Sequence, residues 1–309
     1  MLTRAIGFVS LALVSSSLVR GQSRVPARMI VTIGHTYAGE APPLTTANVS
    51  VTQDHKPLTV TSITAFHGDR AALELFVLVD NCSSCEVGSK FDELSRFIDG
   101  QPATTSIGVG YIQNGQLQMV QAPTTDHKRV IKALSPPGGS KPSSPYNALT
   151  SLIENWKSGD FRRAVLMLST GLDPAQVDDL FGQSKSAETA LHAAQRAEIP
   201  IYAIYHPTAD YLQSDYSKVQ QGQVQLAHVA SESGGQAYFL TFGPLPSLGP
   251  FLADINDHLA KQYLVEFLAK PGRSPGELQE IQVESKSTPP VELLAPSAVV
   301  VGKAKADGQ

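Results

Sequence analysis

The sequence predicts an α/β fold: a Rossmann-like, mostly parallel six-stranded sheet with helices on both faces, plus a small β subdomain from the N- and C-terminal flanks. Two observations support this prediction. Between residues 74 and 262, short apolar segments alternate with longer amphipathic ones, as in parallel sheets covered on both faces. Residues 28–72 and 263–302 carry only β patterns, and neither stretch could cover a hydrophobic face alone.

Each predicted element rests on a local pattern. Strands are predicted at residues 74–79, 106–112, 117–121, 164–168, 201–205 and 236–240. The second and third are separated by little more than Asn114-Gly115, a hairpin signal, so one edge strand should run antiparallel. Helices are predicted at residues 91–98, 126–134, 147–156, 186–199, 224–235 and 252–262, where apolar residues recur at helical spacing.

The N-terminus and the overall charge limit the functional classes. Residues 1–21 combine a basic start, an apolar run of about 15 residues and small residues before a cleavage point, which predicts a secretory signal peptide. The run is short for a membrane span of roughly 20 residues, and no later segment is apolar enough to span. The net charge is −4 with no basic stripe, which argues against nucleic acid as a partner.

One stretch joins a strand end to a cysteine pair. Asp80 directly follows the apolar run FVLV, and Cys82 and Cys85 lie in the following turn. Ligands of open parallel sheets bind outside the carboxyl ends of the strands. In an exported protein the two cysteines are expected to form a disulfide. Their position at a strand–helix junction would also stabilise a thiolate, so a redox site remains an alternative, as does a metal site.

The same stretch resembles the metal-ion-dependent adhesion site of von Willebrand factor type A domains, in which a strand delivers Asp-x-Ser-x-Ser to a divalent cation. Residues 143–149 (SSPYNAL) resemble the family's Thr-containing loop and following helix, and residues 162–173 (RRAVLMLSTGLD) resemble the strand that ends in Thr-Asp-Gly. The β-rich flanks resemble those of a secreted bacterial, Acidobacteria-type branch. The resemblance covers about residues 28–300.

The resemblance implies a degenerate metal site. Asp80 and Ser84 match the family pattern, but Cys82 replaces the first Ser and Thr170 replaces the second Asp. Mg²⁺ requires oxygen ligands, and a sulfur supplies none. The implied ligands, including Asp173 as a substitute carboxylate, are Asp80, Ser84, Ser143, Thr170 and Asp173. We therefore expect no firmly held cofactor, and at most weakly bound Mg²⁺ or Mn²⁺.

The function expected is that of an exported, non-enzymatic module that binds another protein or an envelope polymer. The expected contacts lie in loops 80–87, 136–146, 170–184 and 207–220 and include Asn81, Ser144, Tyr205 and Tyr211. The expected location is secreted or periplasmic. The expected parts are a signal peptide at 1–21, a β segment at 22–72, a type A-like domain at 73–262 and a second β segment at 263–309. Two alternatives are a thiol–disulfide oxidoreductase using Cys82 and Cys85, and a true cation-dependent adhesin.

Overall fold

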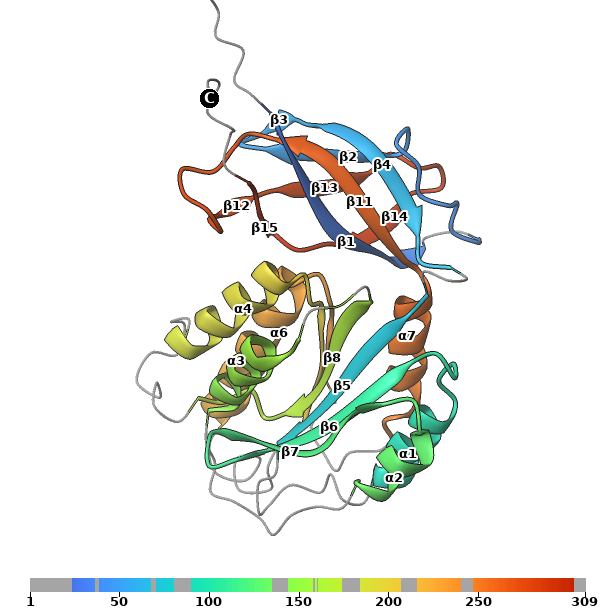
Figure 1. Cartoon of the computed structure of the whole chain (residues 1–309), viewed down its shortest axis with the longest axis vertical. Helices are drawn as coiled ribbons and strands as arrows, with labels where there is room; N and C mark the ends of the chain where they lie inside the picture. Colours follow the sequence, from blue (N-terminus) through green and yellow to red (C-terminus); the bar gives the residue numbers. More distant parts are fainter. Residues whose placement is uncertain are drawn as a thin grey trace, which may run out of the picture.

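The chain forms an α/β unit with a β unit packed against one end of it (Figure 1). The computed structural model describes residues 24–36, 39–67, 71–80, 90–134, 144–157, 159, 161–173, 184–206, 216–239 and 247–302. The expected signal peptide lies outside these residues.

The α/β unit is built on a six-stranded sheet in the order β10-β9-β8-β5-β6-β7. The strands are β5 (Leu73–Asp80), β6 (Ser106–Gln113), β7 (Gln116–Thr124), β8 (Arg162–Ser169), β9 (Ile201–Tyr205) and β10 (Ala237–Tyr238). All neighbouring pairs are parallel except β6 and β7, which form the expected hairpin. The predicted fold class is confirmed.

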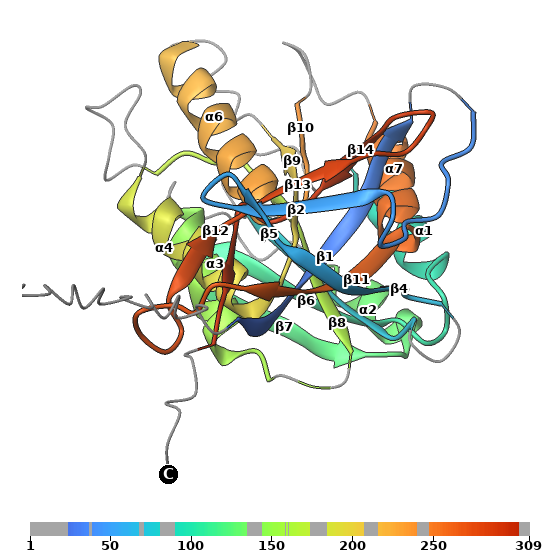
Figure 2. The ribbon, with the colours of Figure 1, turned by 90° about the horizontal axis from the view of Figure 1, so that it is seen from above.

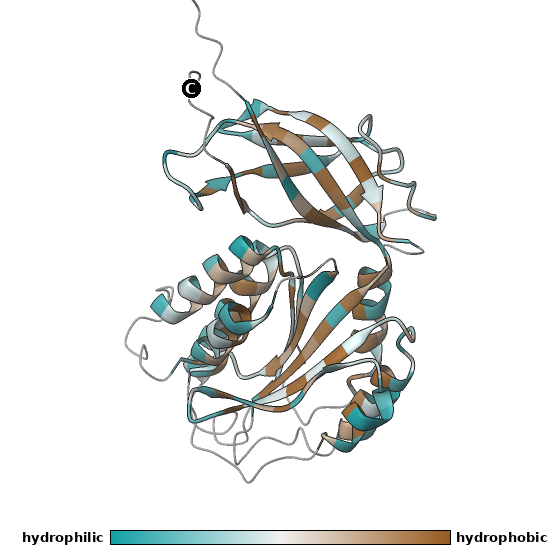
Figure 3. Cartoon of the chain, viewed as in Figure 1, coloured by the Kyte–Doolittle hydropathy of each residue, from teal (hydrophilic) through white to brown (hydrophobic). Residues whose placement is uncertain are grey.

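Helices cover the two faces of this sheet because the buried strands are apolar on both sides. In β5, Leu75, Val77 and Val79 point into the core under α1 (Phe91–Asp99), α2 (His127–Lys132) and α7 (Gly249–Ala260). Phe76 and Leu78 point to the opposite core, under α3 (Pro145–Asn155), α4 (Lys185–Ala197) and α6 (Tyr216–Glu232). The hydropathy colouring shows the apolar central strands between these layers (Figure 3).

Two elements differ in length from the prediction. α6 begins at Tyr216, eight residues before the predicted start. Its first turns bury Gln221, Gly222 and Gln225, which hide the apolar periodicity on which the prediction rested. The last strand is limited to Ala237–Tyr238 instead of residues 236–240.

The β unit combines both ends of the described chain. Its largest sheet has the order β14-β1-β11-β4, and smaller sheets join β13-β2-β3 and β12-β15. The N-terminal strands are β1 (Val25–Thr36), β2 (Val49–Gln53), β3 (Lys56–Pro57) and β4 (Thr59–Ala65). The C-terminal strands are β11 (Gln262–Ala269), β12 (Leu278–Glu280), β13 (Gln282–Ser285), β14 (Val291–Leu294) and β15 (Ala298–Val300). Pairs such as Val25–Ala269 and Thr32–Gln262 enclose one common apolar core.

The two units meet at the edge where the parallel strands begin (Figure 1). Seen from above, the strands of the β unit overlie the central sheet (Figure 2). Only Lys261 separates α7 from β11. Arg162, at the start of β8, donates to the Leu259 carbonyl and to Gln262, and lies 5.4 Å from the centroid of the Phe66 ring. This junction leaves the opposite edge of the sheet, with the carboxyl ends of β5, β8 and β9, free of the β unit.

Candidate functional site

Asp80 lies at the carboxyl end of β5, in the middle of the sheet. Its side chain is 6% exposed, and its Oδ2 accepts a hydrogen bond of 3.0 Å from the Ser169 hydroxyl at the end of β8. Burial raises the pKa of the Asp80 carboxyl to about 6, although hydrogen bonds from Ser169 and from the Thr170 backbone oppose the shift. The site therefore holds a carboxyl group that is costly to ionise without a further positive partner.

A second carboxylate, Asp173, lies in a separate cluster of hydroxyl groups. Ser184, the N-cap of α4, donates to Asp173 Oδ2 at 2.7 Å, and the Ser186 hydroxyl donates to the same oxygen. The hydroxyl oxygens of Ser144 and Ser186 are 3.1 Å apart. An anion at a helix N-terminus is stabilised by free backbone N–H groups and the helix dipole. Asp173 thus places a carboxylate at the N-terminus of α4.

Tyr146 lies close enough to both carboxylates for their charges to act on it. It is fully buried, and its hydroxyl donates to the Gly171 carbonyl at 2.8 Å. Burial raises its pKa well above the ordinary value, and the negative charges of Asp173 and Asp80 add to the effect. The Tyr146 phenol is therefore held neutral beside the two carboxylates.

A close crossing fixes α6 against the end of β8. Gly171 has φ of 66°, and a Cβ there would lie 2.3 Å from the Gly222 carbonyl oxygen. A Cβ on Gly222 would in turn lie 2.1 Å from the Thr170 carbonyl oxygen. The two glycines therefore allow backbone-to-backbone contact beside Asp80, which sets the position of Thr170.

The structure places only some of the predicted site residues. Asn81, Cys82, Ser84, Cys85, Ser143 and Tyr211 lie outside the described residues. Asp80, Ser144, Thr170 and Asp173 are all buried near the same sheet edge. Tyr205 is 2% exposed and belongs to the core under α3, α4 and α6, because β9 is buried on both faces. Its ring is therefore not available at the surface, although the ring centroid of the exposed Phe239 lies 6.4 Å from it.

Sequence reasoning missed Ser169, Tyr146, Ser184 and Ser186. Ser169 ends an apolar strand next to Asp80's strand, and this position could have identified it. Ser184 precedes the helical pattern of α4 as an N-cap does, which is also readable. The role of Tyr146 had no sequence signal, since an aromatic residue in an apolar helix face indicates core packing.

The described residues do not fit a divalent cation. Within that part of the chain, no three His, Cys, Asp or Glu side chains come together as a ligand set. Asp80 accepts from Ser169 and from the backbone, Thr170 is uncharged, and Asp173 is bonded to two serine hydroxyls. A hard cation such as Mg²⁺ needs about six oxygen ligands. A bound cation would therefore require Asp173 to give up its serine partners, or it would require additional ligands from outside the described residues.

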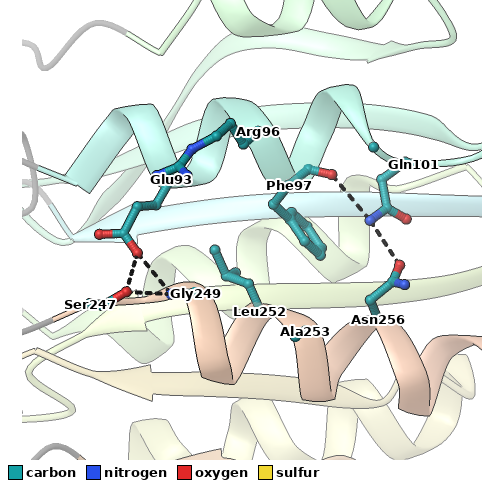
Figure 4. A pocket seen from close by; sticks show the side chains of 10 residues that line it. Glu93, Arg96, Phe97, Gln101, Ser247, Gly249, Leu252, Ala253 and Asn256 are labelled. Atoms are coloured by element: carbon teal, nitrogen blue, oxygen red, sulfur yellow. Dashed lines mark hydrogen bonds between the residues drawn. The ribbon is translucent and has the colours of Figure 1, made fainter.

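A cavity of about 510 Å³ lies on another part of the α/β unit, between α1 and α7 (Figure 4). At one end Glu93 accepts from the Ser247 hydroxyl at 2.6 Å and from the Gly249 N–H at 2.8 Å. Burial opposes ionisation of Glu93, but these bonds lower its pKa. At the other end Gln101 donates to Asn256 at 3.1 Å. These contacts hold the start and the middle of α7 against α1.

Comparisons with known proteins found similarity in structure alone. No protein-family model and no curated protein sequence matches the chain. The VWA domain of SpRpn10 is 11% identical with a TM-score of 0.42, over 59% of this chain and 94% of that one. The vWF domain of the Porphyromonas gingivalis type V pili tip protein Mfa5 is 9% identical with a TM-score of 0.43, over 60% and 95%.

A third similar structure is proximal thread matrix protein 1 from the mussel byssus, solved with a zinc-occupied MIDAS motif. It is 12% identical with a TM-score of 0.43, over 64% of this chain and 47% of that one. The chain thus spans about half the length of the mussel protein.

Proposed function

We propose that this chain is an exported, non-enzymatic binding module of the von Willebrand factor type A family, with a degenerate adhesion site at the carboxyl edge of its sheet. Its partner is another protein or an envelope polymer. The observation that carries the proposal is Asp80, buried at the end of the central strand and bonded to Ser169 on the neighbouring strand. Strand ends of open parallel sheets are where such folds bind ligands.

The position of this edge and the signal pattern support the proposal. The β unit packs against the opposite edge and does not cover this one. No described helix is long and apolar enough to cross a membrane. Export rests on the signal pattern at residues 1–21. In the described residues, the buried polar groups at this edge bond to one another.

Capture of partners from the source envelope tests the binding role. The bait is the purified chain, and the variant Asp80→Asn changes the site carboxyl with little change in shape. The matched control is Asp92→Asn, the same change at an exposed position of α1. We expect a partner that is captured by the wild type and by Asp92→Asn but lost with Asp80→Asn. Equal capture by all three would show that binding, if any, uses another surface.

Metal dependence is tested by thermal unfolding in chelator and then in millimolar Mg²⁺ or Mn²⁺. The wild type should not respond, because both described carboxylates of the site, Asp80 and Asp173, already accept hydrogen bonds from serine hydroxyls. The double variant Cys82→Ser, Thr170→Asp restores a hydroxyl and a second carboxylate. It should gain about 2.7 kcal/mol of stability at a hundredfold excess of metal over Kd.

Each result has a distinct meaning. If the wild type itself gains several degrees with metal, the site is functional and the protein is a cation-dependent adhesin. If neither protein responds, the arrangement inferred from the family pattern is wrong. A silent wild type beside a responsive variant supports the degenerate site.

A further inference from the structure

A second cavity, the α3–β7 cavity, lies between the C-terminal end of α3, the start of β5 and the strand β7. Its volume is about 470 Å³, which is within the range of small-molecule sites in proteins. Most of the described side chains that line it are apolar, and they include Phe76, Leu117, Met119, Leu152 and Trp156. Binding sites for small organic molecules have this composition, with a few polar groups among apolar and aromatic ones.

The aromatic wall of the α3–β7 cavity is fixed by contacts within the protein. The Trp156 ring lies edge-on to Phe76, with 5.7 Å between the ring centroids. Trp156 donates its indole N–H to Glu74, and Arg163 donates to the Trp156 carbonyl at 3.3 Å. Phe76 rests on β6, where a Cβ on Gly108 would lie 2.7 Å from its ring. A wall that is already in place reduces the ordering cost of binding.

The charges around the cavity leave one unpaired cation. Glu74 lies beside Arg163 on the neighbouring strand, and each charge stabilises the other. Lys157 directly follows Trp156, lines the cavity and is exposed, and it has no ion-pair or hydrogen-bond partner among the described residues. A lysine beside an apolar surface can lay its methylene stem on that surface and keep its ammonium group in water.

We propose that the α3–β7 cavity binds a single-chain amphiphile that carries one carboxylate, such as a fatty acid of medium chain length. The acyl chain lies against the apolar lining, and the carboxylate meets the ammonium group of Lys157. The cavity offers few free hydrogen-bonding groups to a sugar, because Glu74 accepts from Trp156 and Asn155 donates to the Ser151 carbonyl at 2.8 Å. An apolar body with one anionic group is the chemistry that this lining complements.

The first experiment varies the length and the charge of the ligand. Trp156 is the single tryptophan of the chain and lines the cavity, so its fluorescence reports binding directly. Hexanoate, octanoate and decanoate are titrated into the purified chain, and the affinity should rise about fourfold for each methylene group that the cavity covers. Octanol should bind more weakly than octanoate, and octylammonium should bind most weakly because Lys157 repels it.

The second experiment changes the protein, with a matched control for each variant. Met119→Asp places a carboxylate in the apolar lining and should weaken octanoate binding by about tenfold or more. Val120→Asp makes the same change at the next residue, which is outside the described lining, and should bind as the wild type does. Met119 and Val120 are 49% and 38% exposed, so neither change disturbs the core.

The role of the lysine has its own pair of variants. Lys157→Gln should weaken octanoate binding by about twofold to fivefold, the strength of an exposed ion pair, and should leave octanol binding unchanged. Lys132→Gln, at an exposed position of α2, is the control and should not alter either affinity.

Four results would overturn the proposal. They are an affinity that does not rise with chain length, octanol binding as tight as that of octanoate, Met119→Asp that binds like the wild type, and a response to vesicles of an anionic two-chain phospholipid but not to octanoate. The last result would indicate a membrane surface as the partner. None of these outcomes involves Asp80, which lies at the other end of β5 from Glu74, so they are separate from the test of the proposed function.

Discussion

The Gly222→Ala substitution tests how tightly α6 is fixed against the site edge. The added Cβ would lie 2.1 Å from the Thr170 carbonyl oxygen and 3.4 Å from the Leu172 nitrogen. Real Cβ atoms essentially never come within 3.0 Å of another heavy atom, so α6 and the end of β8 must separate by about 0.9 Å. The group that must move is a backbone carbonyl, which has little freedom.

Two effects of opposite sign decide the result. Alanine in a helix interior is favoured over glycine by about 1 kcal/mol. Overpacking of a close contact costs about 1–3 kcal/mol, and a contact with rigid backbone belongs at or above the upper end of that range. The clash should therefore outweigh the helix propensity, for a net loss of about 2 kcal/mol in the free energy of unfolding.

Urea unfolding of the wild type, Gly222→Ala and Val224→Ala measures this balance. Val224 lies on the same helix and is 58% exposed, so its replacement by alanine changes propensity without a clash. Val224→Ala should match or slightly exceed the wild type, while Gly222→Ala should fall by about 2 kcal/mol. Gly222→Ala as stable as the wild type would refute the close crossing.

Three other predictions concern individual side chains. Burial lowers the pKa of His258, so the unfolded protein binds a proton at this residue more readily than the folded protein does. The free energy of unfolding should therefore fall as the pH drops below about 6.5. Denaturant unfolding at pH 7.5 and 5.5 should show a smaller fall for His258→Gln than for the wild type. Arg162→Leu should lower the free energy of unfolding by about 1–3 kcal/mol for each buried acceptor left without a donor, and it should speed hydrogen exchange in β11. Arg28→Leu removes an exposed ion pair with Glu198 at the same junction and should lower it by at most about 1 kcal/mol. Alkylation of the exported protein without reductant should label neither Cys82 nor Cys85, and two labelled thiols would contradict the expected disulfide.

The sequence alone determined the layered architecture of the α/β unit. The apolar runs at β5, β8 and β9 could only be buried on both faces, and that requires helices on both sides of a parallel sheet. Asn114-Gly115 determined the one antiparallel edge, because both residues adopt positive φ there, at 51° and 75°. The place of Asp80 also follows from sequence, since it directly ends the central apolar strand.

Only the tertiary structure decided which polar groups meet at that edge. Asp173 accepts hydrogen bonds from serines at the start of α4, and Tyr146 of α3 donates one to Gly171. Both contacts join separate segments of the chain, so no repeating sequence pattern predicts them. Tyr205 shows the same limit in another form. A strand buried on both faces has no polar–apolar alternation, so the sequence does not show that Tyr205, at the end of β9, lies in the core and not at the surface. Local periodicity fixes the elements, but the partners of a buried polar group depend on how distant elements pack.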